Sequence, residues 1–277
     1  MGSTQFGNFH NFCRDSTLPV CNVLSDAHDQ SGPWGGCELR GISVGGDRRL
    51  GNLGSIIIAA LAIATSAFLL FKSERKKAAV GRSPLGPDPT ADPSQAFTGI
   101  HIGLIIASTW ILMLNALVGF QIVDDGTPLS LGLMVLSAAL LFGGTLYITL
   151  DTGFKWTGYW DDSYNSPPNR HIALYVLYQL VPLIFLVAFF VLEAVLVLRI
   201  LGETRPMIYL TAALVLFALG QVFNYVVSSH ICDGTNGAID GALFQTLFTL
   251  LSVVMVWIFW SSITEDDWPM QVGTAYP

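Results

Sequence analysis

Six long runs of apolar residues, almost free of charge, constrain this chain more than any other feature. They cover residues 51–71, 97–120, 129–150, 172–198, 207–228 and 241–260. Each run has at least 20 residues, the length that a helix needs to cross the hydrocarbon core of a bilayer. In lipid only helices and closed barrels satisfy the backbone, and barrel strands would alternate over about ten residues. The sequence therefore predicts an all-α, polytopic membrane protein with six transmembrane helices.

The composition agrees with a chain that lies mostly in a lipid bilayer. Of the 277 residues, 52% are hydrophobic and only 12% are charged, with a net charge of −7, whereas soluble domains have about 25% charged residues. The negative charge leaves no basic surface for nucleic acid. The segments outside the runs are too short for a separate catalytic domain.

The chain divides by composition into a polar head (1–50), the apolar runs (51–260) and an acidic tail (261–277). The head has no apolar stretch of the kind that a cleavable signal needs, so we expect the first run to be an uncleaved anchor. Basic residues crowd the C-terminal side of that run, which favours a cytosolic position there and a lumenal or extracellular head. They are Lys72, Arg75, Lys76, Lys77 and Arg82.

The head contains three of the four cysteines, Cys13, Cys21 and Cys37. A lumenal or extracellular compartment is oxidising and allows disulfides among them. Because so small a head has little apolar core, a disulfide would help it to fold.

A proline-rich segment separates the first two runs. Residues 83–94 contain Pro84, Pro87, Pro89 and Pro93. These prolines prevent a regular helix, and the segment has too few apolar groups to lie in hydrocarbon. We therefore expect a linker there.

Polar side chains inside the runs are the first place to look for function. Glu193 is the only acid within a run and is either a cation or proton site or, as we favour, a group that reaches towards the loop near Arg199 or bonds to another helix. Gln221 and Asn224 are three residues apart and share a helix face, which favours contacts between helices over a ligand site. His101 also lies within a run.

No catalytic, cofactor or metal site is predicted. The five histidines are scattered singly without an H-x-x-x-H pair, and no G-x-S-x-G occurs. Two alternatives are kept open. An intramembrane metal-dependent lipid hydrolase would need His101, Glu193 or Asn224 to converge with other ligands, and a small transporter or receptor would combine Glu193 with Gln221 and Asn224.

Two acidic segments outside the runs are candidate partner contacts. The first joins the second and third runs and has the composition of a tight turn, with paired acids followed by Gly and Thr-Pro. The second is a short acidic cluster after the last run, which a solvated tail would also explain. The residues are Asp124, Asp125, Gly126, Thr127 and Pro128, and then Glu265, Asp266 and Asp267.

Taken in order, short pieces along most of the chain resemble one family, the fungal chitin synthase export chaperones of the endoplasmic reticulum. The pieces are Phe12-Cys13, Ser16-Thr-Leu-Pro-Val-Cys21, Cys37, Ala79-Val-Gly-Arg82, Gly119-Phe-Gln, Asp125-Gly-Thr-Pro-Leu-Ser130, Gly220-Gln221, Tyr225-Val226, Ile231-Cys232, Asp240-Gly241, and Ser262-Ile-Thr264 with Asp266. The resemblance implies a non-enzymatic protein of the endoplasmic reticulum membrane. Its partner would be a chitin synthase, which it would help to fold and to leave for the cell surface.

The family is similar to a seven-span bundle, with one span in the place of the proline-rich segment. This chain therefore looks like that bundle minus one helix. With five crossings before it, Cys232 would lie on the opposite side from Cys13, Cys21 and Cys37. With a sixth crossing all four would face the lumen, and their pairing stays open because four cysteines allow three connectivities.

Overall fold

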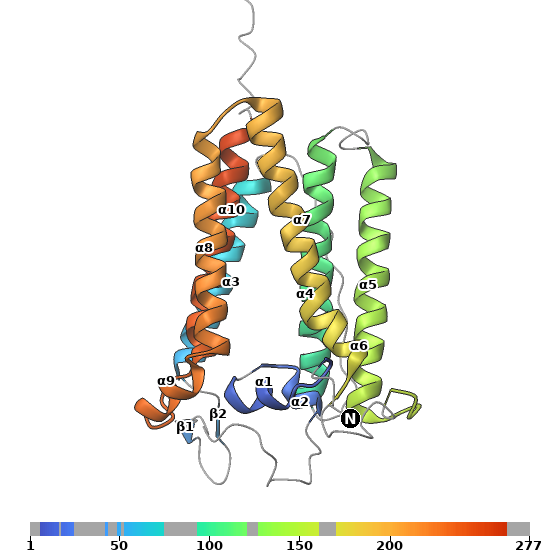
Figure 1. Ribbon diagram of the computed structural model, residues 1–277, viewed down its shortest axis with the longest axis vertical. Coiled ribbons are helices and arrows are strands. Elements are labelled where there is room, and N and C mark those ends of the chain that lie inside the picture. The colour runs from blue at the N-terminus through green and yellow to red at the C-terminus, as the bar shows by residue number, and fades with distance from the viewer. Residues whose placement is uncertain are drawn as a thin grey trace, which may run out of the picture.

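The computed structural model is a bundle of long helices with a small head at one end (Figure 1). It describes residues 6–16, 18–24, 42–43, 49–50, 53–74, 93–120, 127–160 and 170–264. The head contains α1 (His10–Asp15), α2 (Cys21–Leu24) and an antiparallel pair of short strands, β1 (Ile42–Ser43) and β2 (Arg49–Leu50). The helices of the bundle are α3 (Leu53–Glu74), α4 (Pro93–Gly119), α5 (Pro128–Phe154), α6 (Ile172–Tyr175), α7 (Val181–Val195), α8 (Arg205–Tyr225), α9 (Ser228–Gly234) and α10 (Gly241–Ile263).

Each predicted run coincides with a helical segment. Within the described residues, five segments are long and apolar enough to cross a membrane: 95–119, 128–154, 172–201, 205–225 and 241–263. The first run forms α3, whose apolar stretch, Gly54–Leu69, is shorter. The predicted all-helical, multi-pass fold is therefore confirmed for five runs.

Short polar side chains fix where several helices begin. Thr127 precedes α5 and its hydroxyl accepts a hydrogen bond from Ser130 N, while Pro128 occupies the first turn, where its missing N–H costs nothing. In the same way His171 caps α6 and Asp240 caps α10. These caps satisfy N–H groups that the first turn of a helix leaves without a partner.

One span contains two π-helical turns. Residues 172–201 form a continuous rod in which Val176–Leu180 and Leu196–Leu201 are π-helical. The first π segment lies directly before the buried Pro182, which has no N–H to donate to the preceding turn. The wider turn therefore lies where the proline interrupts the backbone hydrogen bonds of the helix.

The bundle consists of two groups of helices, α3 with α8 and α10, and α4 with α5 and α7 (Figure 1). In the first group, Gly220 of α8 packs against Phe248 of α10. In addition, Ser252 Oγ of α10 donates a hydrogen bond to Ala213 O of α8 at 2.8 Å. In the second group, Trp110 Nε1 donates to Ser137 Oγ at 2.9 Å. Away from the bundle ends, the two groups share few close contacts.

At the end opposite the head, which we call the far end, an apolar cluster joins the groups. It contains Ala116 of α4, Phe189 and Val197 from the 172–201 rod, Leu210 of α8 and Phe259 of α10. The head end holds the second junction, described below. The two groups are thus joined at their ends.

The directions of α3 and α4 bear on the position of Cys232. Both helices begin at the head end and run towards the far end (Figure 1). The helix α9, which carries Cys232, lies at the same end as α1 and α2 (Figure 1). Of the two alternatives left open by the sequence, the structure agrees with the one in which Cys232 lies on the same side as Cys13 and Cys21.

The contact between α4 and α5 depends on Gly99 and Gly103, two glycines of α4 that are one helical turn apart. A Cβ at Gly103 would lie 2.8 Å from Phe142 Cδ2 and 3.3 Å from Phe142 O, whereas nothing lies within 4 Å of a Cβ at Gly143. We predict that Gly103→Val destabilises the protein by about 1–3 kcal/mol, because the added side chain overpacks this contact. Thermal unfolding in detergent should show a lower midpoint for Gly103→Val and an unchanged one for the control Gly143→Val. Equal midpoints for the two variants would contradict the packing described here.

Candidate functional site

A disulfide holds the head together. Cys13 of α1 is bonded to Cys21 of α2, with 5.7 Å between their Cα atoms. Around it Phe9, Leu18 and Val20 are almost completely buried. The two cysteines are eight positions apart in the sequence, so the bond closes a short loop around an apolar core that is too small to be stable alone.

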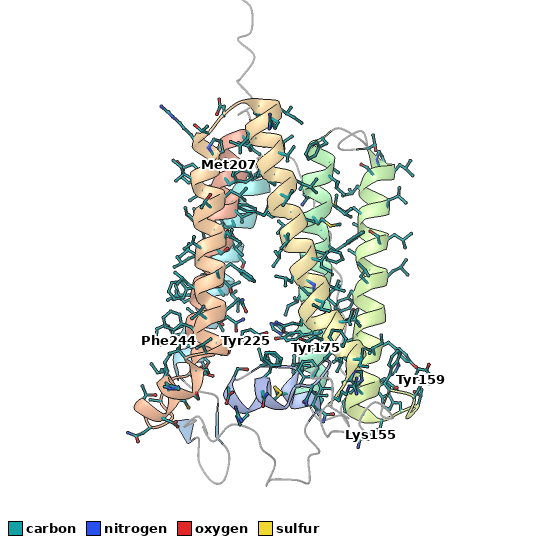
Figure 2. The ribbon with its side chains drawn as sticks, viewed as in Figure 1. Lys155, Tyr159, Tyr175, Met207, Tyr225 and Phe244 are labelled. Atoms are coloured by element: carbon teal, nitrogen blue, oxygen red, sulfur yellow. A yellow bond between two sulfur atoms is a disulfide. The ribbon has the colours of Figure 1, made fainter. Side chains whose placement is uncertain are left out.

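The head bridges the two groups of helices. Phe12 of α1 packs edge-on against Tyr225 of α8, with ring centroids 5.8 Å apart, and also lies beside Tyr175 of α6. Tyr225 Oη donates to Gln179 Oε1 at 2.9 Å, so a hydrogen bond joins the groups directly above the head. Figure 2 shows Tyr175 and Tyr225 next to α1, on its side that faces the bundle.

A buried polar cluster fixes the second contact of the head. His171 N donates to Gly7 O at 2.8 Å, while His171 Nδ1 accepts from Leu174 N at 3.0 Å. Because Nδ1 is an acceptor, the ring proton lies on Nε2, 3.0 Å from Thr152 Oγ1. His171 thus links the head, the end of α5 and the start of α6.

Asp151 organises the loop after α5. Its carboxylate is buried and accepts two hydrogen bonds from Thr157, from N at 2.8 Å and from Oγ1 at 2.7 Å. The C-cap, Lys155, has a left-handed φ of 53° and donates its N–H to Asp151 O. Sequence reasoning missed Asp151, Thr152 and His171. The available signal was an acid in the last turn of a span, since an acid there needs partners.

The far end carries the two predicted contact segments. Thr127 and Pro128 begin α5, and Thr264 follows α10, at this end of the bundle (Figure 1). Asp124, Asp125, Gly126, Glu265, Asp266 and Asp267 lie outside the described residues. Both acidic segments are therefore attached at the same end of the molecule, away from the head.

The structure separates the polar residues predicted within the spans. Gln221 Oε1 accepts from Gln245 Nε2 at 3.4 Å, between α8 and α10. Asn224 is fully buried, and among the described residues its amide has no hydrogen-bond partner. Glu193 is also buried, and its Oε2 has no partner in the same part of the chain. His101 is exposed on α4.

These residues do not converge on one site. Glu193 follows Phe189 by one helical turn, close to the far-end cluster. Asn224 is 14 residues beyond Leu210 of that cluster, which is about 21 Å along α8. Within the described ranges, no three His, Cys, Asp or Glu side chains are grouped as metal ligands would be. In the part of the chain that the structure describes, the residues named for a hydrolase or a transporter site are thus not brought together.

Charged groups in the described head make one exposed contact. Arg14 Nε and Nη2 donate to the Asp15 carboxylate at 2.7 and 2.8 Å. This contact raises the pKa of the Arg14 guanidinium above its ordinary value. An exposed pair of this kind contributes little to stability.

Cys232 is buried and disulfide-bonded. It belongs to α9 at the head end of the bundle. Cys13 and Cys21 are bonded to each other, and the remaining cysteine of the sequence, Cys37, lies outside the described residues.

We predict that Cys13→Ser and Cys21→Ser each destabilise the protein by about 2–3 kcal/mol, since the reduced chain regains the entropy of an open loop. The double variant should be no less stable than either single variant, because all three remove the same bond. Thermal unfolding of the full chain under non-reducing conditions measures this. Additive losses in the double variant would show that the two cysteines act separately.

Comparison with known proteins finds one family along nearly the whole chain. A family model described as chitin synthase export chaperone matches residues 5–86 and 87–274. Proteins named chitin synthase export chaperone from Aspergillus oryzae, Aspergillus fumigatus and Chaetomium globosum are 28%, 29% and 30% identical to it. Each of these alignments covers 97% of this chain and 86% of the relative. No solved structure matches.

The relatives carry residues that this chain lacks. The Aspergillus oryzae alignment extends over 291 positions, and 97% of the 277 residues is about 269, so about 22 aligned positions have no counterpart here. The family match also breaks into two pieces between Gly86 and Pro87, within the proline-rich segment.

Proposed function

Because this chain belongs to the chitin synthase export chaperone family, we propose that it helps a chitin synthase to fold and to leave the endoplasmic reticulum for the cell surface. The observation that carries this proposal is the family match, which extends from the head to the tail. The family is one of chaperones and not of enzymes, so the protein works by binding its client. Its client supports chitin synthesis in the fungal cell wall.

We place the head in the lumen of the endoplasmic reticulum and the far end in the cytosol. The Cys13–Cys21 disulfide supports an oxidising compartment for the head. The basic residues that follow the first run, beginning with Lys72, support a cytosolic far end. The later loops do not decide the orientation, because Lys155 and Arg170 at the head end balance Arg199 and Arg205 at the far end. The five segments that are long and apolar enough to cross a membrane would then lie in the bilayer.

The two acidic segments are proposed as contacts with the client or with the export machinery. Thr127 and Thr264 place their attachment points together at the far end, which this orientation puts in the cytosol. Acidic side chains there would meet basic surfaces through contacts that salt weakens. The candidate residues are Asp124, Asp125, Gly126, Thr127, Pro128, Glu265, Asp266 and Asp267.

We predict that deletion of this protein in its fungal host retains the chitin synthase in the endoplasmic reticulum, because the client lacks its export factor. Fluorescence microscopy of a tagged synthase, with staining of cell-wall chitin, measures this. Reintroduction of the full chain should restore the synthase at the surface. Normal surface synthase in the deletant would refute the proposed function.

We predict that neutralising the acidic segments lowers synthase export several-fold without unfolding the protein. The variant combines Asp124→Asn and Asp125→Asn with Glu265→Gln, Asp266→Asn and Asp267→Asn. Glu203→Gln is the matched control, because Glu203 is an exposed acid in a different loop at the same end. The surface fraction of tagged synthase is the readout. Equal export by the variant and the control would exclude these acids as contacts.

A further inference from the structure

Glu193 is an acid in the apolar contact that joins the two helix groups at the far end. Its side chain is only 6% exposed. It follows Phe189 by four residues and precedes Val197 by four, and both of these residues belong to the far-end cluster. Residues four apart lie on the same face of a helix. The carboxyl group of Glu193 therefore lies on the face of the 172–201 rod that packs in this junction.

The described side chains of this junction provide no charge that could pair with a carboxylate. Arg199, Glu203 and Arg205 are all exposed at the end of the rod and in the loop that follows it. Tyr209 is the one titratable side chain among those that the other helices contribute, and a phenol brings no positive charge. These side chains are Leu112 and Ala116 of α4, Met207, Tyr209 and Leu210 of α8, and Val256, Phe259 and Ile263 of α10.

The other buried acids among the described residues have hydrogen-bond donors. Asp151 accepts two hydrogen bonds from Thr157, and Asp240 accepts one from Leu243 N. Glu193 Oε2, in contrast, has no hydrogen-bond partner in the part of the chain that the structure describes. An ionised carboxylate that is buried without donors or an opposite charge is strongly unfavourable. The surroundings of Glu193 therefore suit a neutral acid.

A proton is the ligand that fits this carboxyl group. Ca²⁺ and Mg²⁺ take about six or more oxygen ligands, whereas no group of three His, Cys, Asp or Glu side chains occurs within the described ranges. A proton needs no second ligand. It removes the charge of the carboxylate, which is the form that apolar surroundings disfavour most.

We propose that Glu193 is a proton-binding switch in the far-end junction. While the carboxyl group holds its proton, the apolar contact is closed; when the proton is lost, the two helix groups separate at the far end. The closed junction thus binds one proton more than the open junction, so a rise in pH favours opening. This inference goes beyond the export function and does not depend on it.

The position of Glu193 explains why opening would occur at the far end. Once ionised, the carboxylate must reach water, and the rod ends at Leu201, eight residues or about 12 Å beyond Glu193. The head end keeps the groups together through the hydrogen bond between Tyr225 and Gln179 and through the packing of Phe12. Opening would therefore bring water to Glu193 while the base of the bundle stays joined.

Infrared spectroscopy of the purified full chain tests whether Glu193 holds a proton. At about pH 7 exposed carboxyl groups are ionised, so a protonated carboxyl gives a separate C=O band. We expect this band in the difference between the unsubstituted protein and Glu193→Gln. The matched control Glu203→Gln, which removes an exposed acid just beyond the rod, should leave the band unchanged. A difference spectrum for Glu193→Gln without a carboxyl band would overturn the proposal.

Distances between spin labels test whether the proton controls the junction. One pair of cysteines replaces Leu131 of α5 and Ile208 of α8 at the far end, and a control pair replaces Phe97 of α4 and Val222 of α8 at the head end; all four positions are exposed. Labelling without reductant leaves the disulfide-bonded cysteines unlabelled. Between about pH 6 and about pH 9, a range in which exposed Glu side chains stay ionised, we expect the far-end distance to increase by several ångströms and the head-end distance to stay constant.

Variants at Glu193 separate the switch from a general effect of pH. Glu193→Gln keeps the shape of the side chain without a group that ionises, and Glu193→Met replaces it with an apolar chain of similar length. Both should hold the far-end distance at its low-pH value throughout. The same increase in these variants, or no increase in the unsubstituted protein, would overturn the proposal. Neither measurement involves the synthase, so the result leaves the export function to its own test.

Discussion

The bilayer requires every backbone N–H and C=O group in hydrocarbon to be bonded within the chain, and this requirement shapes the molecule. It explains why each long apolar run is helical and why helix starts carry caps such as Thr127, His171 and Asp240. It also explains the π-helical turn before Pro182. Proline has no N–H to donate to the preceding turn, and the wider turn accommodates this without ending the helix. What remains for side chains to decide is which helices pack together.

Side-chain contacts join the two helix groups at both ends of the bundle, and they differ between the ends. At the far end the two groups meet through apolar residues such as Phe189 and Phe259. At the head end they meet through Phe12, Tyr175 and Tyr225, with the Tyr225–Gln179 hydrogen bond beside them. The head is therefore a structural part of the bundle. The disulfide that stabilises it also stabilises the arrangement of the spans.

The sequence predicts local features well and distant contacts poorly. The helical runs and the Thr127-Pro128 helix start depend on neighbouring residues, and the structure has them within a few residues of the predicted bounds. The links of His171 to Thr152 and of Gln221 to Gln245 join segments far apart in the chain, and no spacing rule reaches them. The side of Cys232 stayed open at the level of the sequence for the same reason, since the direction of α4 follows from its packing against α5 and α7.

The unequal joining of the two ends has a mechanical consequence. Separation of the helix groups at the far end breaks apolar side-chain contacts, which the acyl chains of lipid replace at little cost. Separation at the head end would also break the Tyr225–Gln179 hydrogen bond and displace a head closed by Cys13–Cys21. The two helix groups are thus harder to separate at the head end than at the far end.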